Sequence, residues 1–263
     1  MVAQEPGKAR LLTRSPGQRR DVPLPGAPAP SSRGVSSKGK TVGYHFDFSW
    51  VPDYLPTFLQ AFKLTLQLLL YSAAASLAVG LLAGQLLTSP RRWISLPVRI
   101  YVDVFRLTPI LLQIVVIFFL LPNVLGLQLS TLVSGVTALS LNYGAFNAEI
   151  FRAGILSVAR GQWEASSALG MTWPQTLRRV VYPQAIRRML PPLGNMLIAL
   201  TKDTSLISVI GVAELFNVAQ SVGAQTFRQL EAFIVIAGFY LIVTLPLAIA
   251  ASVMTRRANA RLQ

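Results

Sequence analysis

The chain has 263 residues, of which 52% are hydrophobic and only 13% are charged, and the apolar residues come in long blocks that exclude an ordinary soluble domain. The absence of cysteine excludes disulfides and thiolate metal sites, and the single histidine, His45, offers no metal cluster and no catalytic pairing. The net charge of +14 does not indicate a nucleic-acid partner, because beyond the N-terminal segment the basic residues flank apolar blocks, as topology signals do.

Residues 1–43 are rich in proline, glycine, serine and basic residues, so we expect a disordered arm before a membrane domain at residues 44–263. The arm matches the phosphate-loop pattern GxxxxGK[ST] at residues 34–41. That loop binds nucleotide between a strand and a helix, whereas here a proline-rich tract precedes it and no α/β pattern follows. We interpret the match as chance, and we expect this chain to be no enzyme and the energy source to lie on another chain.

Five apolar blocks predict an all-α, polytopic membrane protein with one spanning helix per block. Gly80 and Gly84 in the first block predict close approach of another helix. Aromatic residues before it, such as Trp50 and Tyr54, suit the membrane–water interface. The expected spans lie at about 64–87, 97–122, 130–156, 193–212 and 233–254.

Charged residues three positions apart in the second and third spans predict two ion pairs, because such residues share a helix face. The pairs are Asp103 with Arg106 and Glu149 with Arg152. Pro109, between these pairs, is expected to kink the second span.

The fourth span is expected to begin where Pro191 and Pro192 break the preceding helix, and to be interrupted at residues 202–205. Lys202 and Asp203 are consecutive, and neighbours on a helix point about 100° apart. Each therefore needs another partner, such as Glu149 for the lysine, or a substrate. A short helix is expected in the polar loop at residues 214–229.

The polar segment at residues 161–183 predicts two short helices joined at a corner. The first is expected from Gln162 to Leu169, with Glu164 in its first turn, where the helix dipole favours an anion. Gly170 fits the left-handed residue that ends such a helix. Thr172 is expected to cap the second helix, with a proline in its first turn. A rigid elbow of this kind could receive a push from a soluble partner.

The distribution of arginine predicts the topology. The loops at residues 88–99 and 157–188 and the tail at 256–261 are rich in arginine, whereas those at 123–129 and 213–231 are nearly free of it. This places the basic loops and the C-terminus in the cytoplasm and the N-terminus outside. The arm's eight Lys/Arg contradict this pattern, so either the arm is translocated despite its charge or an extra interfacial element returns it to the cytoplasm.

The elbow resembles the EAA loop of bacterial ABC importer permeases. The resemblance rests on Glu164-Ala165-Ser166, Gly170 and Val180-x-Tyr182-Pro183, with serine, valine and tyrosine replacing the usual alanine, isoleucine and leucine. Further segments are similar to the polar amino-acid uptake subfamily over roughly residues 55–255. They are Phe105–Pro109, Glu149–Gly154, Ala168–Thr172, Pro183–Ala185, Arg187–Arg188, Leu190–Pro192, Asn195 and Lys202–Leu206.

The resemblance implies an inner-membrane permease that works as a dimer with an identical or similar chain. It also implies a periplasmic solute-binding protein and two ABC ATPase subunits, which bind ATP and magnesium in place of any cofactor on this chain. The elbow would be the coupling helix that meets the ATPase. The residues expected to carry that coupling are Glu164, Ala165, Ser166, Leu169, Gly170 and Pro183.

An amino-acid substrate presents a carboxylate and an ammonium group together, so its site needs a cation, an anion and hydroxyl or amide groups. The same residues could instead form a network of ion pairs that only holds helices together. Buried ionisable groups are costly in lipid, so they should face protein or water. The candidates are Asn142, Asn147, Glu149, Lys202, Asp203, Thr204 and Ser205.

Two other classes of protein remain as alternatives. In the first, the same charged residues serve an ion-gradient-driven secondary transporter. In the second, the basic arm binds nucleic acid or anionic lipid, with the spans as an anchor. The sequence leaves open which amino acid is carried and whether the partner permease is an identical chain.

Overall fold

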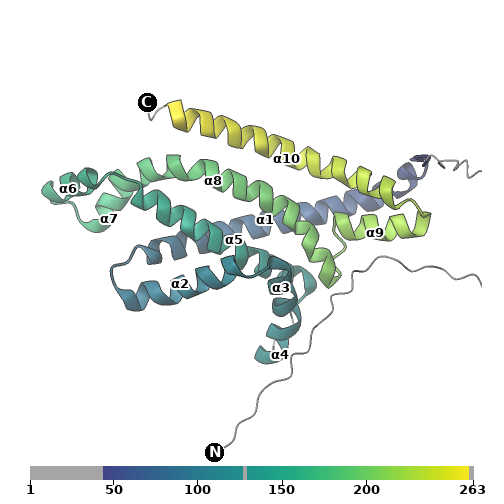
Figure 1. The fold of residues 1–263 in the computed structure, drawn as a ribbon, viewed down its shortest axis with the longest axis horizontal. Helices are drawn as coiled ribbons and strands as arrows, with labels where there is room; N and C mark the ends of the chain where they lie inside the picture. Colours follow the sequence, from purple (N-terminus) through teal and green to yellow (C-terminus); the bar gives the residue numbers. More distant parts are fainter. Residues whose placement is uncertain (1–43, 127–128, 261–263) are drawn as a thin grey trace, which may run out of the picture. The chain divides into compact units, whose positions relative to one another are not determined.

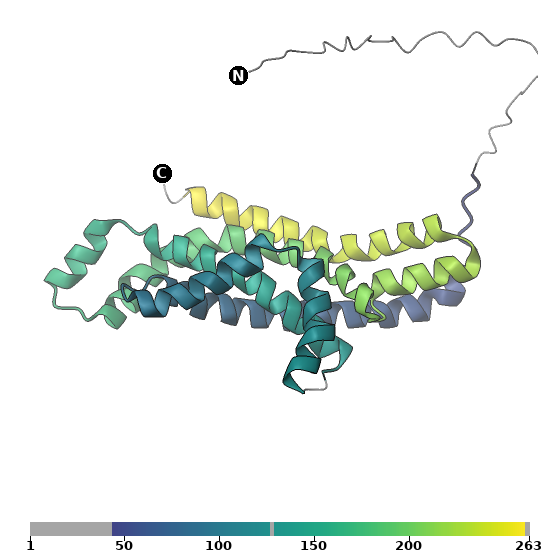
Figure 2. The ribbon, with the colours of Figure 1, turned by 60° about the horizontal axis from the view of Figure 1, so that its bottom comes forward.

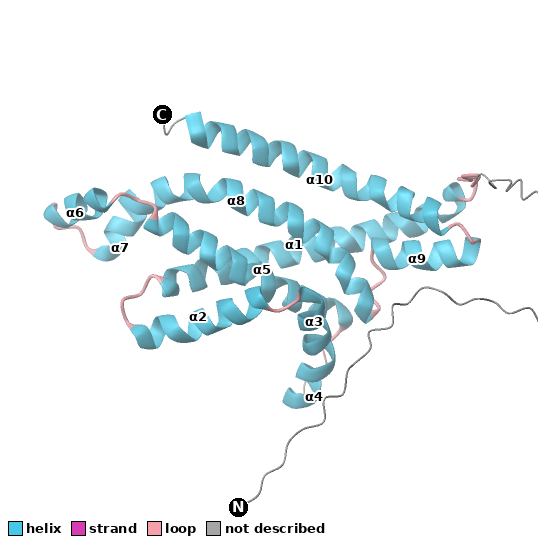
Figure 3. Cartoon of the chain, viewed as in Figure 1, coloured by secondary structure: helices cyan, strands magenta, loops and turns pink. Residues whose placement is uncertain are grey.

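The computed structural model describes residues 44–126 and 129–260, and every regular element in these residues is a helix (Figures 1 and 3). The predicted arm at residues 1–43 and the phosphate-loop match at 34–41 lie outside the described residues.

Helix α1 extends from Val51 to Leu87 and so begins well before the predicted start at residue 64. Pro52 lies in its first turn, where the missing backbone N–H is not needed. Of the aromatic residues expected before the span, Tyr54 is therefore part of the helix itself, and Trp50 is the residue that precedes its first turn. Trp50, Tyr54 and Phe58 pack in one aromatic and aliphatic cluster with residues of α9 and α10.

The second predicted span is broken. Helix α2 (Arg92–Leu107) and helix α3 (Ile110–Val115) meet at an angle of 111° around Pro109, followed by a π-helical turn η1 (Val116–Leu120) and α4 (Leu121–Leu125). The kink expected at Pro109 is confirmed, and the single span over residues 97–122 stays a prediction, because the bent pair is either one broken span or a re-entrant loop. Gln113 explains how the break is tolerated, because its Nε2 donates to the carbonyl oxygens of Phe105 and Thr108 at 2.9 and 3.1 Å.

Helix α5 (Thr131–Leu156) packs along α1 through two glycines. A Cβ atom added at Gly80 would lie 2.4 Å from Cβ of Asn147, and one added at Gly84 would lie 2.6 Å from Cβ of Phe151. The expected close approach is confirmed, and α5 supplies the facing helix.

Gly80→Val is expected to destabilise the folded protein by about 1–3 kcal/mol, because overpacking a close helix contact forces the backbones apart. Thermal unfolding of the detergent-solubilised chain should show a lower Tm. Gly238→Val is the matched control, since a Cβ atom at this glycine of α10 meets nothing within 4 Å. An equal loss of Tm in both variants would contradict the packing account.

The elbow and the fourth predicted span form one chain of helices. These are α6 (Arg160–Ala168), α7 (Trp173–Thr176), a π-helical turn η2 (Leu177–Val181), α8 (Tyr182–Asp203) and a 3-10 helix η3 (Thr204–Ile210). The expected interruption at residues 202–205 is confirmed as the change from α8 to η3.

The expected break at Pro191 and Pro192 was wrong, because α8 continues through both prolines. An interior proline destabilises a helix by about 3 kcal/mol. Close packing before and after the two prolines stabilises the helix in the opposite direction. Met189 fits against Gly154 of α5, and Gly194 lies against Ala251 of α10.

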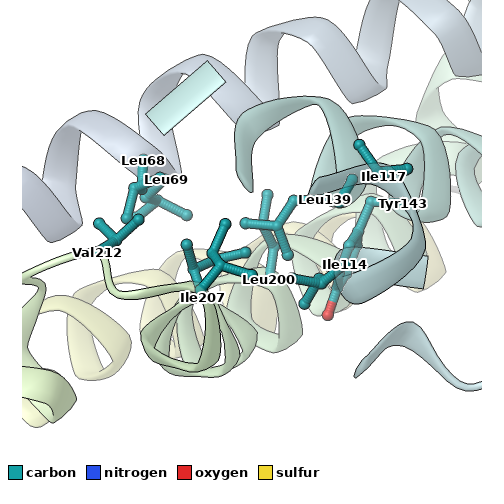
Figure 4. Close-up of a cluster of buried hydrophobic side chains, with 11 residues drawn as sticks. Leu68, Leu69, Ile114, Ile117, Leu139, Tyr143, Leu200, Ile207 and Val212 are labelled. Atoms are coloured by element: carbon teal, nitrogen blue, oxygen red, sulfur yellow. The ribbon is translucent and has the colours of Figure 1, made fainter. Parts of the chain in front are cut away.

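The central core joins α1, α3, α5, α8 and η3 (Figure 4). Leu68 of α1, Leu139 of α5 and Ile207 of η3 are each completely shielded from solvent. Tyr143 is the one member of this core that carries a polar group, and its hydroxyl points to the candidate site described below.

Helix α9 (Leu215–Thr226) and helix α10 (Gln229–Ala260) complete the fold, so the short helix expected at residues 214–229 is confirmed. Glu214 caps α9, since its carboxylate accepts from the backbone N–H groups of Phe216 and Asn217 at 2.9 and 2.8 Å. Tyr240 of α10 donates to the same carboxylate at 3.2 Å.

Burial raises the pKa of the Glu214 carboxyl to about 7, although its backbone hydrogen bonds act in the opposite direction. The folded state therefore favours the protonated form. The resulting stabilisation is fully present below the ordinary pKa of a glutamate, and up to about 3 kcal/mol is lost as the pH rises through 7. The Tm of the wild type should fall between pH 5 and pH 8. Glu214→Gln, which imitates the protonated side chain, should show a smaller fall, and equal slopes would refute the assignment.

Three helical segments in the described residues are long and apolar enough to cross a membrane, or four if the bent α2–α3 pair counts as one span. They are Val51–Leu87, Trp173–Ile210 and Gln229–Arg256. Helix α5 has 26 residues but is not among them, and polar side chains such as Asn142, Asn147 and Glu149 account for this. The count of five spans therefore stays a prediction.

Candidate functional site

The corner of the elbow has the geometry that the sequence predicts. Gly170 has a φ of +71°, and it follows α6 in the left-handed conformation. Gly170 N–H donates to Ser167 O at 3.0 Å and Met171 N–H to Ser166 O at 3.1 Å, which is the Schellman pattern of helix ends. Thr172 then caps α7, where its N–H donates to Gln175 Oε1 at 2.9 Å.

The expected position of Glu164 was wrong. Helix α6 begins at Arg160, so Glu164 lies beyond its first turn and pairs with Arg160 at 2.9 Å instead of neutralising the helix dipole. Both side chains are exposed. An exposed pair of this kind contributes little to stability, so breaking it would cost little free energy.

A buried cluster attaches the elbow to α5 and α8. Trp163 of α6 packs against this cluster, and Gln184 Nε2 of α8 donates to Gln162 Oε1 at 3.3 Å. Arg188 of α8 also donates to the backbone oxygen of Ser157. These contacts fasten the base of the elbow to α5 and α8. The cluster consists of Ile155, Val158, Leu177, Val181, Ala185 and Met189.

Most of the predicted coupling residues lie on the surface of the elbow. Leu169 is 80% exposed at its tip, next to the exposed Gly170. Ser166 is the exception, because its side chain is buried and donates to Trp163 O at 2.8 Å. The exposed members of the predicted set are Glu164, Ala165, Leu169, Gly170 and Pro183.

Two adjoining pockets follow the facing sides of α5 and α8, and we call them together the α5–α8 groove. The first has a volume of about 280 Å³ and the second of about 520 Å³, and Arg106, Phe146 and Met196 line both. Asp203 lies in the first pocket, and Glu149 and Arg188 lie in the second. The groove therefore carries acidic and basic side chains along one open face.

The side chains of the first pocket are held in place. Tyr143 donates its hydroxyl to Asp203 Oδ2 at 2.7 Å. Asn142 is buried, and its Nδ2 donates to Gln113 Oε1 at 2.9 Å and to Phe105 O at 3.1 Å, across the break between α2 and α3. Such fixed polar groups can present an anion and an amide to a solute.

The predicted ion pairs are confirmed only in part. Glu149 and Arg152 pair at 2.8 Å, as expected. Asp103 and Arg106 do not form an ion pair, because the Arg106 guanidinium lies 5.6 Å from the centre of the Phe146 ring across the groove. Glu149 does not pair with Lys202 either, since it has Arg152 beside it on α5.

Four of the seven predicted substrate residues lie away from the groove. Lys202 and Ser205 line a different pocket of about 290 Å³, beside Phe216 and Tyr240. The turn between consecutive helix positions explains why Lys202 and Asp203 face different sides. Thr204 is completely buried, and its hydroxyl donates to Thr201 O at 2.8 Å. Asn147 faces α1, where its Nδ2 donates a hydrogen bond to Ser76 Oγ.

The groove thus brings together Asn142, Glu149 and Asp203 from the predicted set. It adds Arg106, Tyr143 and Arg188, which the sequence reasoning missed. One signal was available for Arg106, because it lies in the last turn of α2 just before the proline break, at a point where a helix end opens onto a cavity.

Membrane-length helices, an exposed elbow and a charged groove together are typical of a membrane permease, and comparison with known proteins gives the family. Residues 76–262 match the family described as "Binding-protein-dependent transport system inner membrane component". The chain belongs to this family, and it is a multi-pass membrane protein.

The relatives and a solved structure agree with this assignment. The chain is similar to the glutamine transport system permease protein GlnP of Escherichia coli (strain K12), at 41% identity over 81% of this chain and 97% of the relative. It is 46% identical to the L-cystine transport system permease protein TcyB of Bacillus subtilis (strain 168), over 65% of this chain and 71% of the relative. A crystal structure of an amino acid ABC transporter with histidines matches with a TM-score of 0.74 and 36% identity, over 81% of this chain and 100% of that chain.

Proposed function

We propose that this chain is the transmembrane subunit of an ATP-driven importer that carries polar amino acids delivered by a periplasmic binding protein. The observation that carries the proposal is the joint presence of a stiffly anchored elbow and a groove with charges of both signs. Relatives named as glutamine, cystine and arginine permeases support the substrate class. The chain itself is no enzyme in this proposal, since ATP and magnesium bind to two partner ATPase subunits.

The charges of the groove suit an amino acid. The carboxylate of Asp203 takes the ammonium group of the substrate, and the guanidinium of Arg106 takes its carboxylate in a charge-assisted contact. Asn142 and Tyr143, which line the same pocket, support the orientation. Glu149 and Arg188 accompany the solute through the second pocket toward the elbow.

A second permease chain, identical or similar, covers the open side of the α5–α8 groove. One chain alone leaves the charged side chains of Glu149 and Arg152 27% and 32% exposed. If these charged side chains faced the lipid acyl chains, their exposure would carry a high free-energy cost. Pairing two chains encloses a polar path between or beside them while the apolar faces stay in contact with lipid.

The ATPase drives the transport cycle through the elbow. The exposed surface around Glu164 and Leu169 seats in a groove of the ATPase, and closure of the ATPase dimer on ATP moves it. The buried cluster at the base of the elbow transfers that displacement to α5 and α8. Because these two helices form the walls of the groove, the motion alters access to the solute.

The distribution of arginine indicates how the chain is oriented in the membrane. Within residues 45–263, the α1–α2 turn, the elbow and the end of α10 lie toward one end of the helices, and α9 lies toward the other (Figures 1 and 2). Arginines such as Arg92, Arg179 and Arg188 belong to the first end, which therefore faces the cytoplasm. The described chain then begins on the periplasmic side, and the C-terminus is cytoplasmic.

Reconstituted vesicles test this proposal against an ion-gradient mechanism. Vesicles that contain the permease, the co-purified ATPase and the binding protein should take up radiolabelled glutamine only with ATP, and vanadate should abolish the uptake. Ionophores that collapse proton and sodium gradients should leave uptake unchanged. Uptake without ATP that disappears with the ionophores would establish the secondary transporter instead.

A further inference from the structure

All four charged residues of α2 lie along one narrow stripe of the helix. Successive residues of a helix turn by about 100°, so these four positions fall within an arc of about 60°. All four side chains are exposed. We call this set the charged stripe, and it consists of Arg92, Arg99, Asp103 and Arg106.

The other two sides of α2 are apolar. One side packs against α1 and α5, where Val102 is completely buried and Val98 and Phe105 contact the same cluster. Helices α2 and α3 together are apolar enough for a broken span or a re-entrant loop, so the charged stripe faces water or protein and not acyl chains. The third side exposes large hydrophobic side chains that suit lipid, namely Trp93, Leu96, Ile100, Val104 and Leu107.

The charged stripe begins at the α5–α8 groove, because Arg106 lines both pockets of the groove. Arg99 and Arg92 lie two and four turns before it, which places them about 10.5 and 21 Å further along the same face. This direction leads to the α1–α2 turn, at the end that the proposed orientation places in the cytoplasm (Figures 1 and 2). The charged stripe therefore extends from the groove toward the side where an imported solute leaves.

Two opposite charges of the stripe have no ion-pair partner among the described residues. Asp103 lacks a cation because Arg106 lies over the ring of Phe146, and Arg99 lacks an anion. Arg99 precedes Asp103 by one turn, which is the less favourable order for an ion pair on a helix. The two positions are separated by about 6 Å along the helix axis. A small solute with both charges can therefore bridge them.

From the proposed function, on which this inference rests, we propose that Arg99 and Asp103 form a second station for the transported amino acid on the cytoplasmic side of the groove. The guanidinium of Arg99 binds the carboxylate of the solute, and the carboxylate of Asp103 binds its ammonium group. Neither residue is among those that line the two pockets of the groove. The solute reaches this station after it leaves Asp203 and Arg106, and the station recognises only the two groups that all α-amino acids share.

A single thiol at position 99 tests the station, because the chain has no cysteine of its own. In vesicles with the ATPase and the binding protein, Arg99→Cys is expected to lower kcat for glutamine uptake about tenfold, since one charge-assisted contact is lost. Treatment with 2-aminoethyl methanethiosulfonate before reconstitution attaches a cation to the thiol and should restore uptake to within about threefold of the wild type. The anionic 2-sulfonatoethyl reagent should not restore it.

Arg91→Cys is the matched control, since Arg91 is exposed but precedes α2 and lies outside the charged stripe. Its uptake should stay within about threefold of the wild type with either reagent. Wild-type transporter treated in parallel reports any effect of the reagents on thiols of the partner subunits. Arg99→Lys, which keeps the charge, should retain uptake, whereas Arg99→Gln and Asp103→Asn should each lower kcat about tenfold.

Protection of the thiol distinguishes solute binding from a purely structural charge. Saturating glutamine, with the binding protein and ATP, should slow the reaction of the Arg99→Cys thiol with the cationic reagent and leave that of Arg91→Cys unchanged. Wild-type uptake by Arg99→Cys, equal restoration by both reagents, or a thiol that glutamine does not protect would overturn the station while wild-type transport stands. A wild type that takes up no amino acid with ATP would overturn the proposed function and the station with it.

Discussion

Asp203→Asn is expected to lower kcat/KM for uptake by about 100-fold, because a charge-assisted hydrogen bond to the substrate ammonium is worth about 1.5–3 kcal/mol and each 1.4 kcal/mol is tenfold. The asparagine keeps the shape of the side chain and still accepts the hydrogen bond from Tyr143, which lies 2.7 Å away in the wild type. Uptake in the reconstituted vesicles described above, measured over a range of substrate concentrations, gives both kcat and KM.

Lys202→Ala is the matched control for this variant. Lys202 is the neighbour of Asp203 in the sequence but lies in a different pocket, beside Phe216 and Tyr240. Its removal is expected to change kcat/KM by less than about threefold, which corresponds to the range of ordinary surface substitutions. A large loss in Lys202→Ala with little effect of Asp203→Asn would place the substrate site on the other face of α8.

Gly170→Arg is expected to leave the particle assembled but to uncouple ATP hydrolysis from uptake. A side chain at a φ of +71° costs about 1–2 kcal/mol, and relief of that strain changes the angle between α6 and α7. Uptake should fall about tenfold or more while ATP hydrolysis by the same preparation continues. The ratio of substrate transported to ATP hydrolysed is the quantity to measure.

Gly126→Arg is the control variant that distinguishes the effect of backbone strain from a loss of coupling between ATP hydrolysis and uptake. Gly126 has a φ of +65°, and a Cβ atom at either glycine meets nothing within 4 Å, so the two substitutions impose similar strain. Gly126 ends α4, far in sequence from the elbow. Its variant should keep the wild-type ratio of transport to hydrolysis. Normal transport by Gly170→Arg, or equal uncoupling in both variants, argues against the elbow as the coupling element.

Local features of the fold could be predicted from the sequence because their causes are local. Gly170 and Thr172 define the corner of the elbow through backbone conformation and capping alone. Glu149 and Arg152 pair because three positions on one helix bring them together. The bend at Pro109 follows from the missing N–H and the ring of proline, although its size depends on Gln113 from the next helix.

Features that depend on contacts between helices were missed or mistaken. Arg106 turns to the ring of Phe146 on α5 instead of to Asp103, and no spacing in the sequence indicates that neighbour. Pro191 lies inside α8, where Met189 before it packs against α5 and Gly194 after it packs against α10. Tyr143 belongs to the groove only because α5 lies against the end of α8, which brings its hydroxyl to Asp203.

The central claim is that the elbow seats on an ATPase, and one cross-linking measurement tests it most directly. The chain contains no cysteine, so Leu169→Cys places a single thiol at the exposed tip of the elbow, and Phe227→Cys places one at the opposite end, where the native side chain is 92% exposed. In vesicles that transport, a photoactivated cross-linker on Leu169→Cys should capture the ATPase subunit, and one on Phe227→Cys should not. Active vesicles in which Leu169→Cys never captures the ATPase, with or without ATP, would contradict the account.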